Sequence, residues 1–349
     1  MLRPFTSESM IQPQEPGWDD QLGFRYREAD ALWVAVWKEG LDWKPGQLYE
    51  HQGATFEISP GANVFQYGQG IVEGLKARRT RDGRAFLFRP LDHARRLRQS
   101  AAYLAMEAPS APDILNAIHS VAEANQRWIP GFGKGSLYLR PAIIGSGTVL
   151  GVSPAPEYIF YVFPSPVGQY LGGDRLKVLC AAHRAAPYGI GAAKAAGNYS
   201  ASLRPQKLAR EAGYTDVLYL DARENRYVEE CSGASFLVIL KDGTMVAPSL
   251  GSILPGITRD SIITIARELF GWIVVERKLS LDEVIQDAAE AFYTGTATIL
   301  APVTTVNVQG VDHPIGDGNP GPRSMALRQA LDEIQVGGQP DLWGWLVEV

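Results

Sequence analysis

The chain has 349 residues, which exceeds the usual size of one hydrophobic core, so two domains are expected. Hydrophobic residues make up 46% and charged residues 20%, as in ordinary globular proteins, and the formal net charge is -5. This charge excludes the basic surface that nucleic acid requires. Cys180 and Cys231 are too few for a disulfide framework, and no apolar run suits export or membrane insertion. We therefore expect a cytoplasmic protein that binds neither nucleic acid nor membrane.

The first half of the chain reads as a mixture of strands and helices. Residues 1–30 include a polar stretch with Pro13 and Pro16, which predicts a loosely ordered arm. Short apolar runs then predict strands, and one run with helical spacing predicts a helix. These are TFEIS at 55–59, AFLFR at 85–89, the helical DHARRLRQSAAYLAM at 92–106, SLYLRPAIIG at 136–145 and EYIFYVFPSP at 157–166.

Glycines collect in VGQYLGGDR, residues 167–175, and predict an interdomain linker. Beyond it we expect a strand at 176–184, hairpins at 216–230 and 235–248, a helix at 258–270, a strand at 273–277, a helix at 281–288, a strand at 291–294 and a helix at 324–334. The pattern predicts a mixed α+β fold with a small domain, 1–166, and a larger domain, 176–349, that carries the key lysine described next.

Common catalytic motifs are missing from the sequence. It contains no HExxH, GxSxG or GxxxxGK[ST], and its five histidines lack metal-ligand spacing, so no metal site is expected. The run YGIGAAKAAG approaches a dinucleotide fingerprint, but Lys194 stands where the last glycine is needed. A helical run containing Pro205 also follows where an unbroken βαβ unit would be required.

Lys194 itself is the leading candidate for chemistry. Alanines flank it on both sides and GNYS follows, so other charges are absent nearby. Burial in such surroundings makes a lysine amine nucleophilic towards an aldehyde cofactor, although a solvated loop lysine is the plainer interpretation. An aldehyde cofactor of the pyridoxal type also needs a carboxylate at its ring nitrogen and donors for its phosphate.

Other segments supply candidates for those needs. Glu230 ends a hairpin strand, and Pro255-Gly256 precedes a helix whose first backbone N–H groups, at Ile257 and Thr258, could hold an anion. An ordinary N-cap by Thr258 is the alternative. Arg96 and Thr296 are further candidate donors, although a basic helical run is usually a solvated face.

Taken together these segments resemble the branched-chain amino acid aminotransferases, which are fold type IV pyridoxal-phosphate enzymes. The resemblance runs from about Val64 to the C-terminal WGWL. It rests on QYGQGIVEGLKA, FLFRPLDHARRL, YLRP, KAAGNY, ILPGITRD and TGTATILAPV, which occur in the family's order.

The resemblance implies roles for individual residues. Lys194 would carry pyridoxal 5'-phosphate and shuttle the proton between the substrate and the cofactor. Glu230 would partner the pyridine nitrogen and Tyr199 the phenolic oxygen. The phosphate would be bound by Arg96, Ile257, Thr258 and Thr296. The substrate would contact Tyr67, Tyr138, Arg140, Tyr170, Thr296 and Ala297.

The implied reaction is reversible, ping-pong amino transfer through a Schiff base. It would run from L-leucine, L-isoleucine or L-valine to 2-oxoglutarate, with glutamate and 2-oxo acids as the other substrates. Family members are commonly homodimers or larger, so a homo-oligomer is expected. Val72 stands where many relatives have an aromatic residue and Ser235 where asparagine is common. Thr298 and Ala301 replace the CxxC pair of some animal relatives.

Rival functions remain open at this point. D-amino acid aminotransferases and aminodeoxychorismate lyases share the fold type, but their chains are typically shorter, and the YLRP and ILPGITRD spellings favour the branched-chain group. A non-catalytic cofactor-binding protein and a dinucleotide-dependent oxidoreductase are remoter alternatives.

Overall fold

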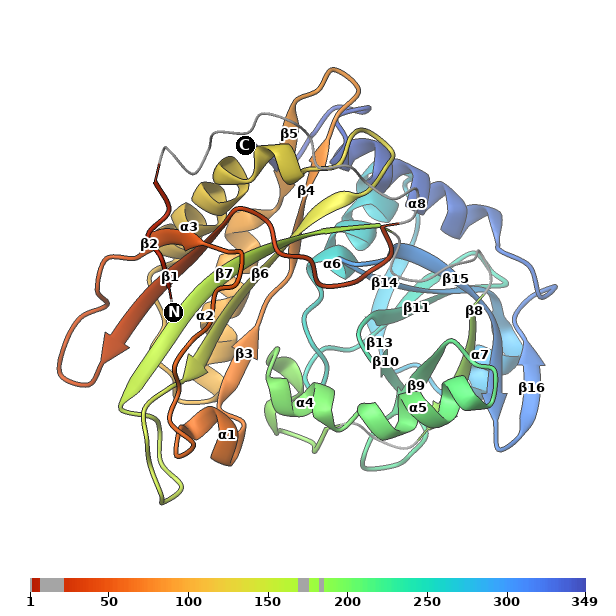
Figure 1. Cartoon of the computed structure of the whole chain (residues 1–349). Helices are drawn as coiled ribbons and strands as arrows, with labels where there is room; N and C mark the ends of the chain where they lie inside the picture. Colours follow the sequence, from red (N-terminus) through yellow and green to blue (C-terminus); the bar gives the residue numbers. More distant parts are fainter. Residues whose placement is uncertain (1, 7–21, 169–175, 182–184) are drawn as a thin grey trace. The chain divides into compact units, whose positions relative to one another are not determined.

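The chain forms two compact units in the computed structural model, which describes residues 2–6, 22–168, 176–181 and 185–349 (Figure 1). Unit 1 comprises Met1–Tyr170, Ala193–Gly197 and Ile334–Val349, and unit 2 comprises Leu171–Ala192 and Asn198–Glu333. The predicted mixed helix-and-sheet class is confirmed. The predicted boundaries at 166 and 176 stay a prediction, because residues 169–175 of the predicted linker lie outside the described residues.

Unit 1 is built on an eight-stranded antiparallel sheet. Its order is β17-β5-β4-β6-β7-β1-β2, and β3 pairs with β6 beside β4. The long central strands β6 and β7 are buried along most of their length, which explains their continuous apolar runs. The strands are β1 (Ala31–Lys38), β2 (Gln47–Glu50), β3 (Gly70–Val72), β4 (Leu75–Arg79), β5 (Ala85–Phe88), β6 (Ser136–Gly145), β7 (Glu157–Val167) and β17 (Leu346–Glu348).

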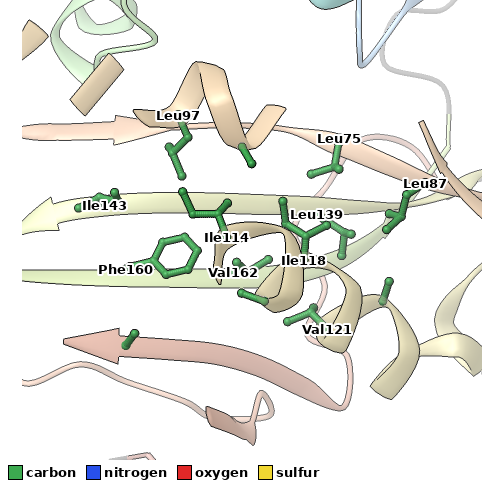
Figure 2. Packing of buried hydrophobic residues seen from close by; sticks show 14 of the residues in the cluster. Leu75, Leu87, Leu97, Ile114, Ile118, Val121, Leu139, Ile143, Phe160 and Val162 are labelled. Atoms are coloured by element: carbon green, nitrogen blue, oxygen red, sulfur yellow. The ribbon is translucent and has the colours of Figure 1, made fainter. Parts of the chain in front are cut away.

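Two amphipathic helices, α2 (Pro90–Tyr103) and α3 (Ala111–Ala124), cover one face of this sheet. Figure 2 shows Leu97 of α2 and Ile114 and Ile118 of α3 pointing towards Leu139 of β6 and Phe160 of β7. Each buried Leu or Ile side chain contributes about 1.5–3 kcal/mol relative to exposure. The short helices α1 (Asn63–Tyr67) and η2 (Gln126–Trp128) complete the unit.

Unit 2 has a nine-stranded mixed sheet that closes on itself. Its order is β10-β9-β8-β15-β14-β11-β12-β13, β16 pairs with β15, and the additional pairing of β10 with β11 joins the ends of a six-strand ring. The strands are β8 (Leu176–Ala181), β9 (Asp216–Leu220), β10 (Val228–Cys231), β11 (Ser235–Leu240), β12 (Met245–Pro248), β13 (Val274–Arg277), β14 (Ala288–Gly295), β15 (Ile299–Val308) and β16 (Val311–Pro314).

Helices of unit 2 lie between these strands in the chain (Figure 1). They are η3 (Ile190–Ala192), α5 (Leu203–Glu211), α6 (Ile257–Thr264) with its π-helical continuation η4 (Ile265–Leu269), and α7 (Leu281–Asp287). The helices α4 (Ala196–Ser200) and α8 (Pro322–Gln335) cross the boundary between the two units. Within the described residues, no helix is long and apolar enough to span a membrane.

Most predicted elements are confirmed, including the hairpin that turns at Asp242-Gly243, where Gly243 has a φ of 87°. The strand predicted at TFEIS, 55–59, is wrong, because no ladder forms there. Instead Phe56 packs its ring against Tyr161 of β7, with the ring centroids 5.3 Å apart.

The structure divides the chain differently from the sequence at two places. The segment Ala193–Gly197, which contains Lys194, and the C-terminal residues Ile334–Val349 belong to unit 1. The C-terminal strand β17 joins this unit because it pairs antiparallel with β5. Backbone bonds to unit 1 explain the position of Lys194 and are described below.

A buried histidine, His51, is hydrogen-bonded within the N-terminal part of unit 1. His51 is 2% exposed, and its Nδ1 accepts a hydrogen bond from the Ala29 N–H at 3.0 Å, which leaves Nε2 as the protonated nitrogen facing Tyr26. Burial lowers the pKa of His51 to about 4, with the charge of Glu28 acting in the opposite direction. The folded state therefore prefers the neutral imidazole.

This preference predicts a pH-dependent stability of unit 1. Because the unfolded histidine takes up its proton near its ordinary pKa and the folded one only near 4, the stabilisation is present above pH 6.5 and is lost as the pH falls. Between pH 7.5 and 5 we expect wild type to lose about 2 kcal/mol more than His51→Asn. Urea unfolding followed by tryptophan fluorescence measures this, and equal losses in the two proteins would contradict it.

Candidate functional site

The backbone of Lys194 is held within unit 1 from two sides. Its N–H donates to the Ser100 hydroxyl of α2 at 2.9 Å, and its carbonyl accepts from the Val72 N–H of β3 at 3.0 Å. A bridge between Ile71 and Ala195 continues the pairing with β3. The Lys194 side chain is half-buried. A lysine fixed at its backbone keeps its amine near one place while the side chain retains its own freedom.

One face of α2 lines this lysine segment. His93, Arg96 and Ser100 follow one another at helical spacing and are all buried, whereas Arg95 and Arg98 of the same run are exposed. The predicted donor Arg96 thus differs from its neighbours, which form the solvated face expected of a basic run.

Arg96 forms a buried ion pair with a glutamate that sequence reasoning did not single out. Its Nε donates to Glu73 Oε1 at 2.6 Å and its Nη2 to Glu73 Oε2 at 2.9 Å. His93 Nδ1 lies 2.8 Å from the same Oε2, and the Gly74 N–H donates to it at 3.1 Å. The Glu73 side chain is 0% exposed. Hydrogen-bond donors of the protein therefore compensate the charge of this carboxylate.

These contacts decide the protonation states. Burial by itself would raise the pKa of Glu73, but the charge of Arg96 and the hydrogen bonds from His93 and Arg96 hold this pKa well below its usual range. Burial lowers the pKa of His93. The nearby charges of Arg96 and Lys194 also lower it, whereas Glu73 raises it. His93 is thus a neutral imidazole whose Nδ1 donates to an ionised Glu73.

Two of the predicted substrate-binding residues lie next to Glu73 and its hydrogen-bond partners. Tyr138 and Arg140 lie on β6, where Arg140 Nη2 donates to the Tyr138 hydroxyl at 3.2 Å. A Cβ on Gly74 would lie 1.7 Å from that hydroxyl oxygen, so only glycine allows this approach. Phe24 packs edge-on against Tyr138 with the centroids 5.2 Å apart. An aromatic wall with one arginine results.

A second group of predicted residues, which includes Glu230, lies in unit 2. Glu230 is 5% exposed, and its Oε1 accepts from the Leu254 N–H at 3.4 Å. Glu230 pairs with Ser235, and Ser235 pairs with Thr294, so one line crosses β10, β11 and β14. Buried Ser235, the departure noted in the sequence, thus adjoins the predicted ring partner.

The N-terminus of α6 lies against the same strand. A Cβ on its N-cap Gly256 would lie 2.7 Å from the Ser235 hydroxyl oxygen. The N-cap residue is Gly256, which has no side-chain cap bond, so the predicted alternative of an N-cap by Thr258 is wrong. Ile257 and Thr258, both buried, open the helix. Their N–H groups point along a helix end that favours an anion.

Two further predicted residues lie in the turn that follows β14. Thr296 and Ala297 lie in the turn between β14 and β15, closed by the Thr298 N–H donating to the Gly295 carbonyl at 3.2 Å. The hydroxyl of Thr294 donates to the Ile299 carbonyl and tightens this turn. Both predicted residues are half-buried, so they lie at the surface of unit 2.

The remaining predicted residues are three tyrosines. Tyr67 ends α1, is 44% exposed and donates its hydroxyl to the Leu150 carbonyl. Tyr199 lies half-buried in α4. Tyr170 lies outside the described residues.

Sequence reasoning missed Glu73, Gly74, His93 and Ser100. The last two could have been found, because they share the face of the predicted helix that carries Arg96. Glu73 and Gly74 follow a strand of only three residues, and nothing in their spacing connects them with Arg96.

The close approach of Gly74 and Tyr138 gives a test. Gly74→Ala forces Tyr138 to move, and overpacking of this kind costs about 1–3 kcal/mol in the free energy of unfolding. The matched control is Gly151→Ala, because a Cβ there meets nothing within 4 Å. Urea unfolding compares the two, and equal stability of both variants would show that Tyr138 is not held against Gly74.

Comparison with known proteins adds independent information. The family described as Amino-transferase class IV matches residues 70–306. The chain is 42% identical to "Branched-chain amino acid aminotransferase 2, chloroplastic" of Humulus lupulus, over 99% of this chain and 84% of the relative. It is 39% identical to "Methionine aminotransferase BCAT4" of Arabidopsis thaliana, over 95% of this chain and 93% of the relative.

Among solved structures, the branched-chain amino acid aminotransferase of Escherichia coli is similar, with a TM-score of 0.77 and 30% identity. The match covers 91% of this chain and 99% of that one. The resemblance first drawn from QYGQGIVEGLKA, KAAGNY and ILPGITRD is therefore confirmed over nearly the whole sequence. This chain belongs to the branched-chain aminotransferase family of amino-transferase class IV.

Proposed function

We propose that this protein transfers the amino group of L-leucine, L-isoleucine or L-valine to 2-oxoglutarate, reversibly and in a ping-pong manner, with pyridoxal 5'-phosphate carried by Lys194. The observation that carries the proposal is the fixed backbone of Lys194, which lies between β3 and the α2 face that bears Arg96. Family membership supplies the reaction class, and the relatives from Humulus lupulus and Escherichia coli, both named branched-chain amino acid aminotransferases, support the substrate class.

The described residues fit this cofactor in chemical type. Arg96 is a cation, Lys194 carries a primary amine, the α6 N-terminus that follows Gly256 suits a phosphate, and Glu230 is a buried carboxylate. When bound, pyridoxal phosphate supplies an electron sink for the bond being broken at the substrate α-carbon.

The proposed roles in cofactor binding follow from these types. Glu230 holds a proton at the ring nitrogen, and Tyr199 donates to the phenolic oxygen. The phosphate is bound by Arg96, Ile257, Thr258 and Thr296. Lys194, released by the incoming amino acid, moves the proton at the α-carbon.

The proposed substrate residues answer a demand for two unlike side chains. The pocket must accept an apolar leucine side chain and, in the second half-reaction, the distal carboxylate of 2-oxoglutarate. Aromatic rings suit the first, and Arg140 with the Tyr138 hydroxyl suits the second. Tyr67 and Tyr170 complete the proposed pocket, and the N–H groups of Thr296 and Ala297 bind the α-carboxylate.

Two further assignments are part of the proposal. We assign the protein to the cytoplasm, because its two cysteines are too few for the disulfide framework typical of an oxidising compartment. We also assign it a homodimeric or larger assembly, which light scattering of the purified protein would measure.

An absorption spectrum tests the function. Purified protein with pyridoxal phosphate should show the band of the lysine-bound cofactor, and L-leucine should bleach it while D-alanine does not. Lys194→Ala should lack the band and lose at least about 10³-fold in activity, because the nucleophile is gone. Bleaching by D-alanine alone would instead identify a D-amino acid aminotransferase.

A further inference from the structure

We propose that Glu73 is a positioning residue for the cofactor phosphate: its buried carboxylate, shared with His93, fixes the guanidinium of Arg96 in the orientation that meets this anion. The inference rests on the proposed function, because it takes the phosphate of pyridoxal phosphate as the ligand of Arg96. It adds a role for Glu73 and His93, to which the sequence analysis assigned none.

The geometry of the ion pair supports this role. Glu73 engages Nε and Nη2, which together form one edge of the guanidinium plane. Such a two-point contact fixes both the position and the rotation of the plane, whereas a single bond would leave the rotation open. An anion that meets Arg96 therefore approaches a group whose orientation is already set.

The surroundings of Glu73 fix the carboxylate in turn. Its Oε2 also takes the His93 Nδ1 and the Gly74 N–H, and its own backbone N–H donates to the Pro141 carbonyl at 2.7 Å. His93 and Arg96 are three residues apart on the same face of α2. The carboxylate thus binds two side chains of one helix and has little room to rotate.

Stability alone does not explain a charged network at this place. A fully buried ion pair is expensive to desolvate, and apolar residues of similar size often serve the fold equally well. The helix face that carries the network also holds the Lys194 backbone through Ser100. The network therefore orients an anion donor beside the lysine segment.

Electrostatics alone predicts the opposite result from positioning. Glu73 places a negative charge behind Arg96, so removing this charge would strengthen the attraction of Arg96 for a phosphate. In Glu73→Gln, however, the amide NH2 faces one of the donors from Arg96 or His93, and the two-point contact is lost. Positioning therefore predicts weaker phosphate binding, and a simple counter-charge predicts tighter binding.

The experiment compares two ligands that differ only in the phosphate. Dissociation constants of pyridoxal 5'-phosphate and of pyridoxal are measured by absorbance on the cofactor-free full-length protein. In Glu73→Gln the constant for pyridoxal phosphate should rise at least about tenfold, while that for pyridoxal stays within about threefold. The ratio of the two constants cancels any loss of folded protein, which lowers both affinities alike.

Two variants calibrate this ratio. Arg96→Gln removes the anion donor itself and defines the full loss of phosphate discrimination. Glu290→Gln is the matched control, because Glu290 is also buried and accepts from the N–H groups of Arg323 and Ser324 in unit 2. It should lower thermal stability and leave the ratio at the wild-type value.

An unchanged ratio in Glu73→Gln, or tighter binding of pyridoxal phosphate, would overturn the inference. If Glu73→Gln does not fold, Glu73→Asp gives the same comparison, since it keeps the charge but withdraws the carboxylate from Arg96. Failure of the wild-type protein to bind pyridoxal phosphate would instead contradict the proposed function. The two failures are thus distinguishable.

Discussion

The two backbone hydrogen bonds of Lys194 are the constraint on which the rest of the site depends. They join the segment around this residue to β3 and to α2, although the neighbouring chain on both sides belongs to unit 2. A loop of alanines and glycines has high conformational freedom and would not place an amine by itself. Pairing with a strand and a helix of unit 1 supplies the order that its composition lacks.

The same two elements carry the buried charges. β3 leads directly into Glu73 and Gly74, and α2 carries His93, Arg96 and Ser100. The Glu73 carboxylate is ionised because Arg96 supplies the compensating charge within 2.6 Å, and burial keeps His93 neutral. Unit 1 thus contains the lysine segment and an oriented arginine, whereas unit 2 contains a buried carboxylate and the N-terminus of α6.

The sequence predicted those features whose cause is local. Apolar runs predicted β6 and β7, and Asp242-Gly243 predicted a hairpin turn, because periodicity and turn chemistry act over a few residues. The prediction of a strand failed at TFEIS, where the ring of Phe56 packs against β7 and no strand pairing forms. The role of Glu73 could not be read at all, because its partner Arg96 lies 23 residues away. Ser100 could be placed on the face of the predicted helix that carries Arg96, but its bond to Lys194, 94 residues away, could not.

The most direct test of the central claim is to identify the residue that carries the cofactor. Borohydride reduction of the protein with pyridoxal phosphate fixes the phosphopyridoxyl group on the amine to which it is bound, and proteolysis with mass spectrometry locates it. The account predicts one modified peptide, containing Lys194, and its loss when L-leucine is added before reduction. Modification spread over other lysines, or none at all, would contradict the account.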